Sequence, residues 1–68
     1  MDVRLRLANN LRALRTRRGL SQEAFAFEVG LHRTYISDLE RGARNPTIVV
    51  VDRLAIALEV TPGELLDA

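Results

Sequence analysis

The sequence contains no cysteine, no lysine and no tryptophan, and it has a single histidine, His32. Without cysteine, neither disulfides nor thiolate metal sites are available. One histidine cannot build a metal site alone. The sequence also has no paired carboxylates in a plausible cleft, no Ser/His/Asp set and no phosphate-binding loop. It therefore argues against an enzyme, and we expect no metal, no cofactor and no small-molecule ligand.

Long apolar runs are missing as well. No segment approaches the roughly 20 apolar residues that are needed to span a bilayer. The opening stretch, MDVRLRLANN, lacks the apolar core of a signal peptide. We therefore expect a soluble cytoplasmic protein that has no membrane partner. The 68 residues are enough for one domain, residues 1–68, with a modest core.

The charges are distributed unevenly, although the net charge is only +1. All ten basic residues are arginines, and six of them precede Gly19, where the only acid is Asp2. The stretch after Pro46 has one arginine and four acids: Asp52, Glu59, Glu64 and Asp67. A basic region is typical of nucleic-acid binders, but a solvated helix face gives the same pattern.

Hydrophobic periodicity predicts helices and gives no clear strand. One apolar stripe predicts a helix over about residues 3–18 that ends at Gly19; the stripe contains Val3, Leu7, Leu11 and Leu14. Ser21 is a suitable N-cap for a second helix. This helix has an inward face of Phe25, Ala26 and Val29 and ends at a turn at Gly30.

A third short helix is predicted from about Arg33 to Arg41, with Ile36 and Leu39 on its buried side. Thr47 caps a fourth helix, from Ile48 to Glu59, whose predicted inward set is Ile48, Val51, Leu54, Ala55 and Leu58. The residues Thr61-Pro62-Gly63-Glu64 form a capping box that opens a fifth helix reaching Asp67.

The stretch SQEAFAFEVGLHRTYISDLERGARNP, residues 21–46, resembles the helix-turn-helix of the lambda repressor/Cro-like family, also called the XRE family. The resemblance extends from about Leu11 to Leu66. The run Arg33–Ser37 with Arg44-Asn45 is similar to the controller proteins of restriction–modification systems. The resemblance implies an all-α, compact five-helix bundle, with the second and third helices as the helix-turn-helix and the third as recognition helix. It also implies a homodimer and an ion pair between Arg15 and Glu40.

The resemblance and the chemistry of the side chains together predict a DNA interface. Arginine can donate to guanine O6 and N7 together, and hydroxyls bind either bases or phosphates. The predicted base contacts are Arg33, Thr34, Ser37 and Asp38. Asp38 either accepts from cytosine N4 or repels phosphate. The predicted backbone contacts are Gln22, Tyr35, Arg41, Arg44 and Asn45, and Arg44 has base edges as an alternative target.

Several apolar residues remain after a small core has been assigned, which favours a partner surface. We expect an isologous dimer built mainly from the fifth helix and its flank, with Val49, Val50, Val60 and Leu66 as candidates. Phe27 has the alternative of plugging the edge of the core. Histidine is a poor cap, so His32 is expected to be a plain surface residue that starts the third helix weakly.

The leading hypothesis is a sequence-specific DNA-binding transcriptional regulator that acts as a homodimer on a near-palindromic operator. Its third helix would lie in the major groove of double-stranded DNA. The alternative is an antitoxin-like or other protein-interaction module on the same fold, which the leftover apolar surface and acidic C-terminal end would suit.

Overall fold

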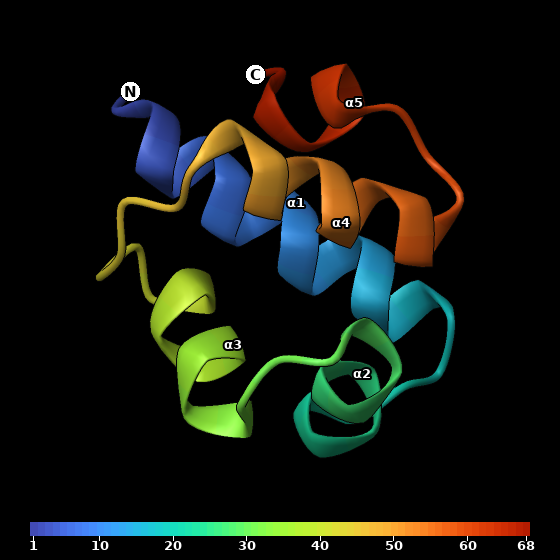
Figure 1. The fold of residues 1–68 in the computed structure, drawn as a ribbon. Coiled ribbons are helices and arrows are strands. Elements are labelled where there is room, and N and C mark those ends of the chain that lie inside the picture. Colours follow the sequence, from blue (N-terminus) through green and yellow to red (C-terminus); the bar gives the residue numbers. More distant parts are fainter.

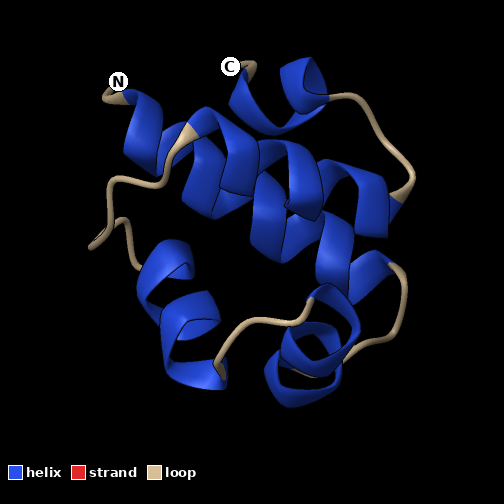
Figure 2. Cartoon of the chain, in the orientation of Figure 1, coloured by secondary structure: helices blue, strands red, loops and turns tan.

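The computed structural model describes residues 1–68 and contains five helices without any strand (Figure 2). The helices are α1 (Val3–Arg17), α2 (Gln22–Val29), α3 (Arg33–Glu40), α4 (Ile48–Leu58) and α5 (Pro62–Leu66). The predicted all-α, five-helix class is confirmed. No helix in the structure is both long and apolar enough to cross a bilayer.

The five helices divide into two sides around a central pair. In Figure 1, α2 and α3 lie together at one side of the molecule, and α5 lies at the opposite side with both termini. The helices α1 and α4 cross between them. Every helix contributes a side chain with no exposed surface to one shared core: Leu11, Phe25, Ile36, Leu54 and Leu65. The helix-turn-helix is therefore supported by the whole core.

A side chain caps the first turn of each helix. The caps predicted at Ser21, Thr47 and Thr61 are confirmed, because each hydroxyl accepts a hydrogen bond from the backbone amide three residues later. His32 is exposed, as predicted, but it is more than a plain surface residue. Its Nδ1 accepts a hydrogen bond of 3.0 Å from the Thr34 amide, so the imidazole does cap α3.

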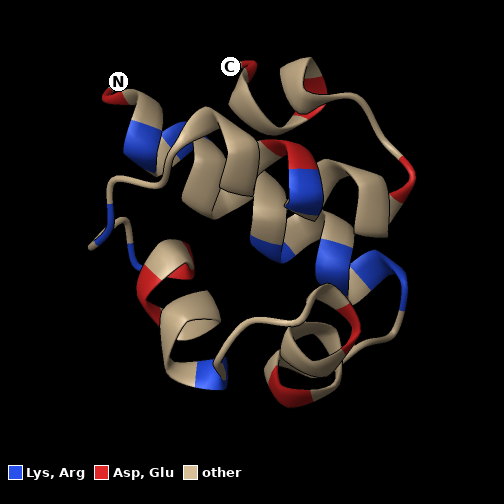
Figure 3. Cartoon of the chain, viewed as in Figure 1, with Lys and Arg blue, Asp and Glu red and all other residues tan.

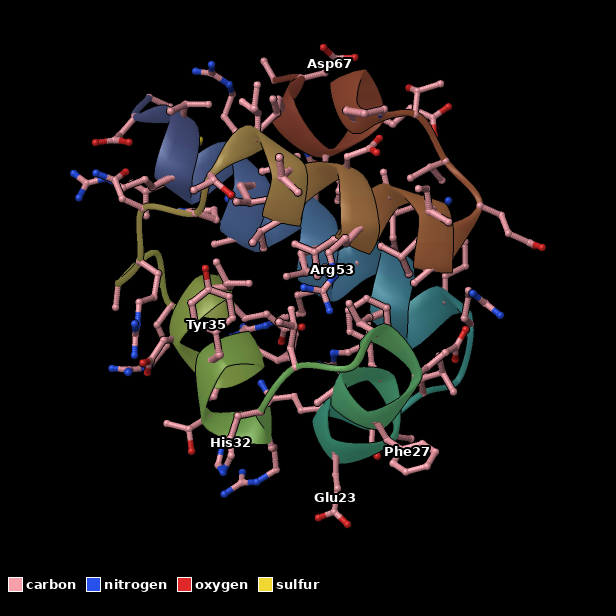
Figure 4. The ribbon with its side chains drawn as sticks, viewed as in Figure 1. Glu23, Phe27, His32, Tyr35, Arg53 and Asp67 are labelled. Atoms are coloured by element: carbon pink, nitrogen blue, oxygen red, sulfur yellow. The ribbon has the colours of Figure 1, made fainter.

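Three apolar residues lie in positions that differ from the predicted ones. Val3 and Ile48 were assigned inward, but their exposed fractions are 44% and 83%, because each begins its helix beyond the edge of the core. Phe27 does not plug the core edge, since 89% of its surface is exposed. It lies two residues from buried Phe25, about 200° around the helix, and therefore points away from the bundle (Figure 4).

The turn between α2 and α3 is held from α4. Gly30 ends α2 with φ of 81°, a left-handed conformation that glycine adopts without strain. Arg53 of α4 donates from Nη2 to the carbonyls of Val29 and Gly30, at 2.9 and 3.4 Å. Figure 4 shows the Arg53 side chain reaching toward this turn. These bonds fix the position of the segment that leads into α3.

Side chains of α1 hold the C-terminal end of α5. Arg6 Nε donates to the Leu66 carbonyl at 2.8 Å, and Asn10 Nδ2 donates to the carbonyls of Leu65 and Asp67, at 3.0 and 2.8 Å. The last carbonyls of a helix have no partner within the helix, so these bonds supply the missing donors. They tie the two ends of the chain together, on the side opposite α3.

Candidate nucleic-acid interface

The helix α3 is sharply two-sided. Ile36 and Leu39 are 0% and 1% exposed and pack in the core. Arg33 and Thr34 are exposed at the start of the helix, and Ser37 is half-buried one turn later. None of the ion pairs in the structure involves Arg33. The helix thus presents an arginine fork and two hydroxyls on a surface that the core holds from behind.

Glu40, at the end of α3, is buried against α1 and α2. Its carboxylate accepts from Arg15 Nε at 2.6 Å and from Arg15 Nη2 at 3.0 Å, a two-pronged contact. Gln22 Nε2 donates to the same carboxylate at 3.0 Å, and Arg12 Nε lies 3.6 Å from it. One carboxylate therefore connects three helices.

The pKa of Glu40 results from two opposing influences. Burial of the carboxyl group raises its pKa, while the hydrogen bonds from Arg15 and Gln22 lower it. The hydrogen bonds and the nearby positive charges prevail, so the pKa lies below its ordinary value. Glu40 is therefore ionised at neutral pH within the helix-turn-helix.

Asp38, a predicted base contact, is engaged within the chain. One carboxylate oxygen accepts from Arg41 Nη2, and the other accepts from Arg44 Nε at 3.2 Å. The Arg44 guanidinium carbon also lies 5.1 Å from the centroid of the Tyr35 ring. The hydrogen bond from Arg41, followed by that from Arg44, lowers the pKa of Asp38 below its ordinary value. The structure thus joins one predicted base contact to three predicted backbone contacts.

The remaining predicted backbone contacts lie apart from this cluster. Gln22 is half-buried and one of its two amide N–H groups donates to Glu40, so its other N–H and its oxygen are left without a partner in the chain. Asn45 is exposed and lines a shallow apolar groove beside Pro46. Both lie near α3, one before it and one after it along the chain.

The charges of the two signs are mixed in space. Figure 3 shows arginines along α1, in the segment after α1 and in the segment after α3, whereas acids mark α2, α3, α5 and the connection between α4 and α5. Not every arginine is available to a ligand. Arg18 donates to the Ala57 carbonyl and lies 3.6 Å from Glu28. The arginines that follow α3 are half or more exposed.

The four predicted dimer residues do not form one patch. Val49 is 66% exposed, whereas Val50, Val60 and Leu66 are half-buried and pack against the core. Leu66 lines the apolar groove at the start of α4, together with Ile48. Val60 lines a different hollow, with Leu14 and Glu59, at the other end of α4.

Sequence reasoning missed several roles, among them those of His32 and Arg12, and it misplaced Ile48. The capping role of His32 was dismissed on residue preference alone, although its position just before α3 was the available signal. Ile48 was assigned to the core by helical spacing, but it lies in the first turn after the Thr47 cap, beside a groove and not in the core. Arg12, beside Glu40, carried no signal that separated it from the other arginines.

Comparison with known proteins agrees with this geometry. The helix-turn-helix family HTH_3 matches residues 11–65. Control protein C.BamHI of Bacillus amyloliquefaciens is 45% identical over 67 residues, covering 97% of this chain and 83% of its own length. Control protein C.SmaI of Serratia marcescens is 46% identical over 66 residues, covering 97% and 79%.

Two solved structures have the same fold. The hypothetical transcription factor NHTF from Neisseria superposes with a TM-score of 0.94 at 41% identity, over 97% of this chain and 76% of its own. The restriction–modification controller protein C.AhdI from Aeromonas hydrophila superposes with a TM-score of 0.86 at 47% identity, over 91% and 94%. The chain therefore belongs to the HTH_3 helix-turn-helix family, of lambda repressor/Cro-like (XRE) type, whose members are DNA-binding transcription regulators and not enzymes.

Proposed function

We propose that the protein is a sequence-specific transcription regulator that acts as a homodimer on a near-palindromic operator, with α3 in the major groove. One observation carries the proposal. Arg33 and Thr34 stand exposed at the start of a helix whose opposite side is anchored by Ile36 and Leu39. Because the proposed target is double-stranded DNA, we also propose a cytoplasmic location.

Base reading is assigned to the first turns of α3. Arg33 is exposed and without an ion-pair partner, so its fork is available to guanine O6 and N7. Thr34 and Ser37 offer hydroxyls to bases and, in the case of Thr34, a methyl group to thymine. A helix of eight residues with these side chains fits a groove that is about 12 Å wide.

Backbone binding is assigned to residues on either side of α3. Gln22 precedes the helix, Tyr35 lies on its flank, and Arg41, Arg44 and Asn45 follow it. Phosphate contacts fix the position of the protein on the duplex and add affinity that falls as salt rises. The arginines after α3 are suited to this role because both are half or more exposed beside the recognition helix.

The dimer contact is assigned to the start of α4. Ile48 and Val49 are exposed there, beside an apolar groove that Val3 and Leu66 also line. An exposed apolar patch of this kind favours a partner surface, and a two-fold dimer uses the same patch on both copies. The similarity to control proteins supports a controller function for this chain.

Selection from a randomised duplex pool, at two salt concentrations, tests the proposal. We expect enrichment of a near-palindrome whose half-sites lie about one helical turn, roughly 34 Å, apart. Arg33→Ala is expected to relax one base position in each half-site, at a cost of about 1–3 kcal/mol. If DNA were retained without enrichment of any sequence, and the retention fell steeply with salt, the protein would bind DNA only through its basic surface. No retention at low salt would favour the protein-interaction module instead.

A further inference from the structure

Asp38 holds two arginines at once, one on each carboxylate oxygen. Arg41 donates to Oδ1, and Arg44 donates from Nε to Oδ2 at 3.2 Å. The Asp38 side chain is only 15% exposed, whereas those of Arg41 and Arg44 are 61% and 50% exposed. The carboxylate thus lies beneath the two guanidinium groups, and these groups are the outer surface of the cluster.

Arg44 is held from a second direction by Tyr35. Its guanidinium carbon lies 5.1 Å from the centroid of the Tyr35 ring. Tyr35 and Asp38 are three residues apart on α3, so their side chains lie on one face of that helix. Arg44 lies beyond the end of α3, in the segment that leads to α4. The recognition helix therefore holds an arginine that is not part of it.

Because Asp38 binds only one nitrogen of Arg44, the other donor groups of that guanidinium remain free. Only Nε of Arg44 donates a hydrogen bond within the chain. Both Nη groups remain available, and together they form the end of the guanidinium fork, the part that binds guanine or phosphate in a two-pronged contact. An arginine held by Nε keeps this end free. Because its side chain is already ordered, it loses less conformational entropy when it binds.

We propose that Asp38 is a positioning residue that presents the Nη groups of Arg44 to DNA, and that it does not read a base itself. This inference rests on the proposed function of α3. To accept from cytosine, the carboxylate would have to give up its hydrogen bonds to two guanidinium groups and lie unpaired near the negatively charged phosphates. With both arginines bound, the three side chains carry a net charge of +1, so the cluster attracts phosphate despite its acid.

Two neutral substitutions separate positioning from charge. Asp38→Ala and Asp38→Asn both remove the negative charge, but only asparagine keeps an oxygen that accepts from Arg44 Nε. The measured quantity is the ratio of affinities for the selected operator and for a scrambled duplex of equal length. We expect Asp38→Ala to lower this ratio about tenfold, and Asp38→Asn to keep it within about threefold of wild type.

The same pair of substitutions in an Arg44→Ala background identifies the residue through which Asp38 acts. We expect alanine and asparagine at position 38 to give equal ratios there, because no Arg44 fork remains to be positioned. A difference that persists without Arg44 would show that Asp38 acts by another route, as a base reader or through Arg41, and would overturn the proposal. If Asp38→Ala and Asp38→Asn gave equal affinity ratios with Arg44 present, the loss of negative charge would explain the whole effect. That result would also overturn the proposal.

A measurement without DNA keeps the inference distinct from the proposed function. In the free protein, the Arg44 Nε–H resonance should shift and exchange faster in Asp38→Ala, and remain close to wild type in Asp38→Asn. If no operator is selected, the proposed function fails while this test can still be read. An Arg44 resonance that is indifferent to Asp38→Ala would contradict positioning whatever the DNA result.

Discussion

Glu40 is the residue at which the recognition helix is joined to the rest of the protein. Its side chain has no exposed surface, and it receives three hydrogen bonds from Arg15 and Gln22. An acid at the C-terminal end of a helix is unfavourable for the helix dipole, so this residue depends on its partners. The pair positions α3 against α1 at the cost of removing two charges from water.

We predict that Glu40→Ala strongly destabilises the fold. The substitution leaves the Arg15 guanidinium buried, with only the Leu20 carbonyl, at 2.7 Å, as its remaining acceptor. Breaking a buried pair from one side costs about 3–5 kcal/mol, a large part of the 5–15 kcal/mol that stabilises a typical domain. Urea unfolding followed by circular dichroism measures the change in the free energy of unfolding.

Arg12→Ala provides the matched control. Arg12 approaches the same carboxylate at 3.6 Å, but its side chain is 59% exposed. An exposed pair contributes at most about 1 kcal/mol. A melting temperature of Glu40→Ala equal to that of wild type, or a loss in Arg12→Ala as large as that in Glu40→Ala, would disprove the special role of the Arg15 contact.

The same carboxylate predicts how stability depends on pH. The pKa of Glu40 in the folded protein lies below its ordinary value of 4.5, and those of Asp2 and Asp38 are lowered as well. A lowered pKa stabilises the fold above the unfolded-state pKa, and this contribution is lost as pH falls through the folded-state pKa. We expect the free energy of unfolding to decrease below about pH 4.5. Glu40→Gln should decrease less steeply, and an identical slope would contradict the assignment.

The partners of Glu40 and of Asp38 differ in how far the sequence predicts them. An acid at the end of a predicted helix requires a cation, and the family resemblance pointed to Arg15. The contact between Asp38 and Arg44 depends on the path of the chain after α3, because that segment must return to the face that carries Tyr35. Helical spacing does not predict the path of a loop, so the contact between Asp38 and Arg44 could be found only in the structure.

At the scale of the element, α3 begins at an unusual cap. His32 Nδ1 accepts from the Thr34 amide at 3.0 Å, so the neutral imidazole must carry its proton on the other nitrogen. This bond satisfies one of the amides that have no partner at the start of a helix. It also orders the first turn, which holds both Arg33 and Thr34.

We predict that His32→Ala destabilises the protein by about 0.5–2 kcal/mol, the usual cost of losing a cap. His32→Asn should restore most of this stability, since the asparagine side chain offers an oxygen to the same amide. Hydrogen exchange at the Thr34 amide measures the local effect, and thermal unfolding measures the global one. Equal stability of the alanine and wild-type proteins would mean that the imidazole contributes nothing as a cap.

The helices were predictable because their signals are local. Hydroxyl caps, glycine stops and apolar spacing gave bounds that lie within about two residues of those observed, such as Ile48–Glu59 against Ile48–Leu58. Where α4 ends, Glu59 adopts φ of 60°, a left-handed conformation that the sequence did not indicate because no glycine stands there. Val3 and Ile48 were misplaced because periodicity gives the direction of a side chain but not whether another helix reaches it.

At the scale of the whole molecule, α4 exposes two apolar surfaces, one at its start and one two turns later, and Val49 and Ile56, seven residues apart, face nearly the same direction. Ile48 and Val49 lie at the start of α4, and Ile56 lies two turns later on the same helix, beside Glu28 and Val29 of α2. Only the first surface adjoins the apolar groove lined by Val3 and Leu66. A two-fold contact there uses the same patch on both copies, so a change at Val49 enters the interface twice.

We predict that Val49→Asp dissociates the proposed dimer, because it introduces two carboxylates, one from each copy, into an apolar contact. Ile56→Asp is the control, since it makes the same change on the same helix at nearly equal exposure, 67% against 66%. In sedimentation at about micromolar concentration, wild type and Ile56→Asp should be dimers and Val49→Asp a monomer. On DNA, Val49→Asp should lose affinity for a two-half-site operator and keep its affinity for a single half-site, because α3 is unchanged. A wild-type monomer would refute the dimer, and loss of the dimer in both variants would extend the interface along the outer face of α4.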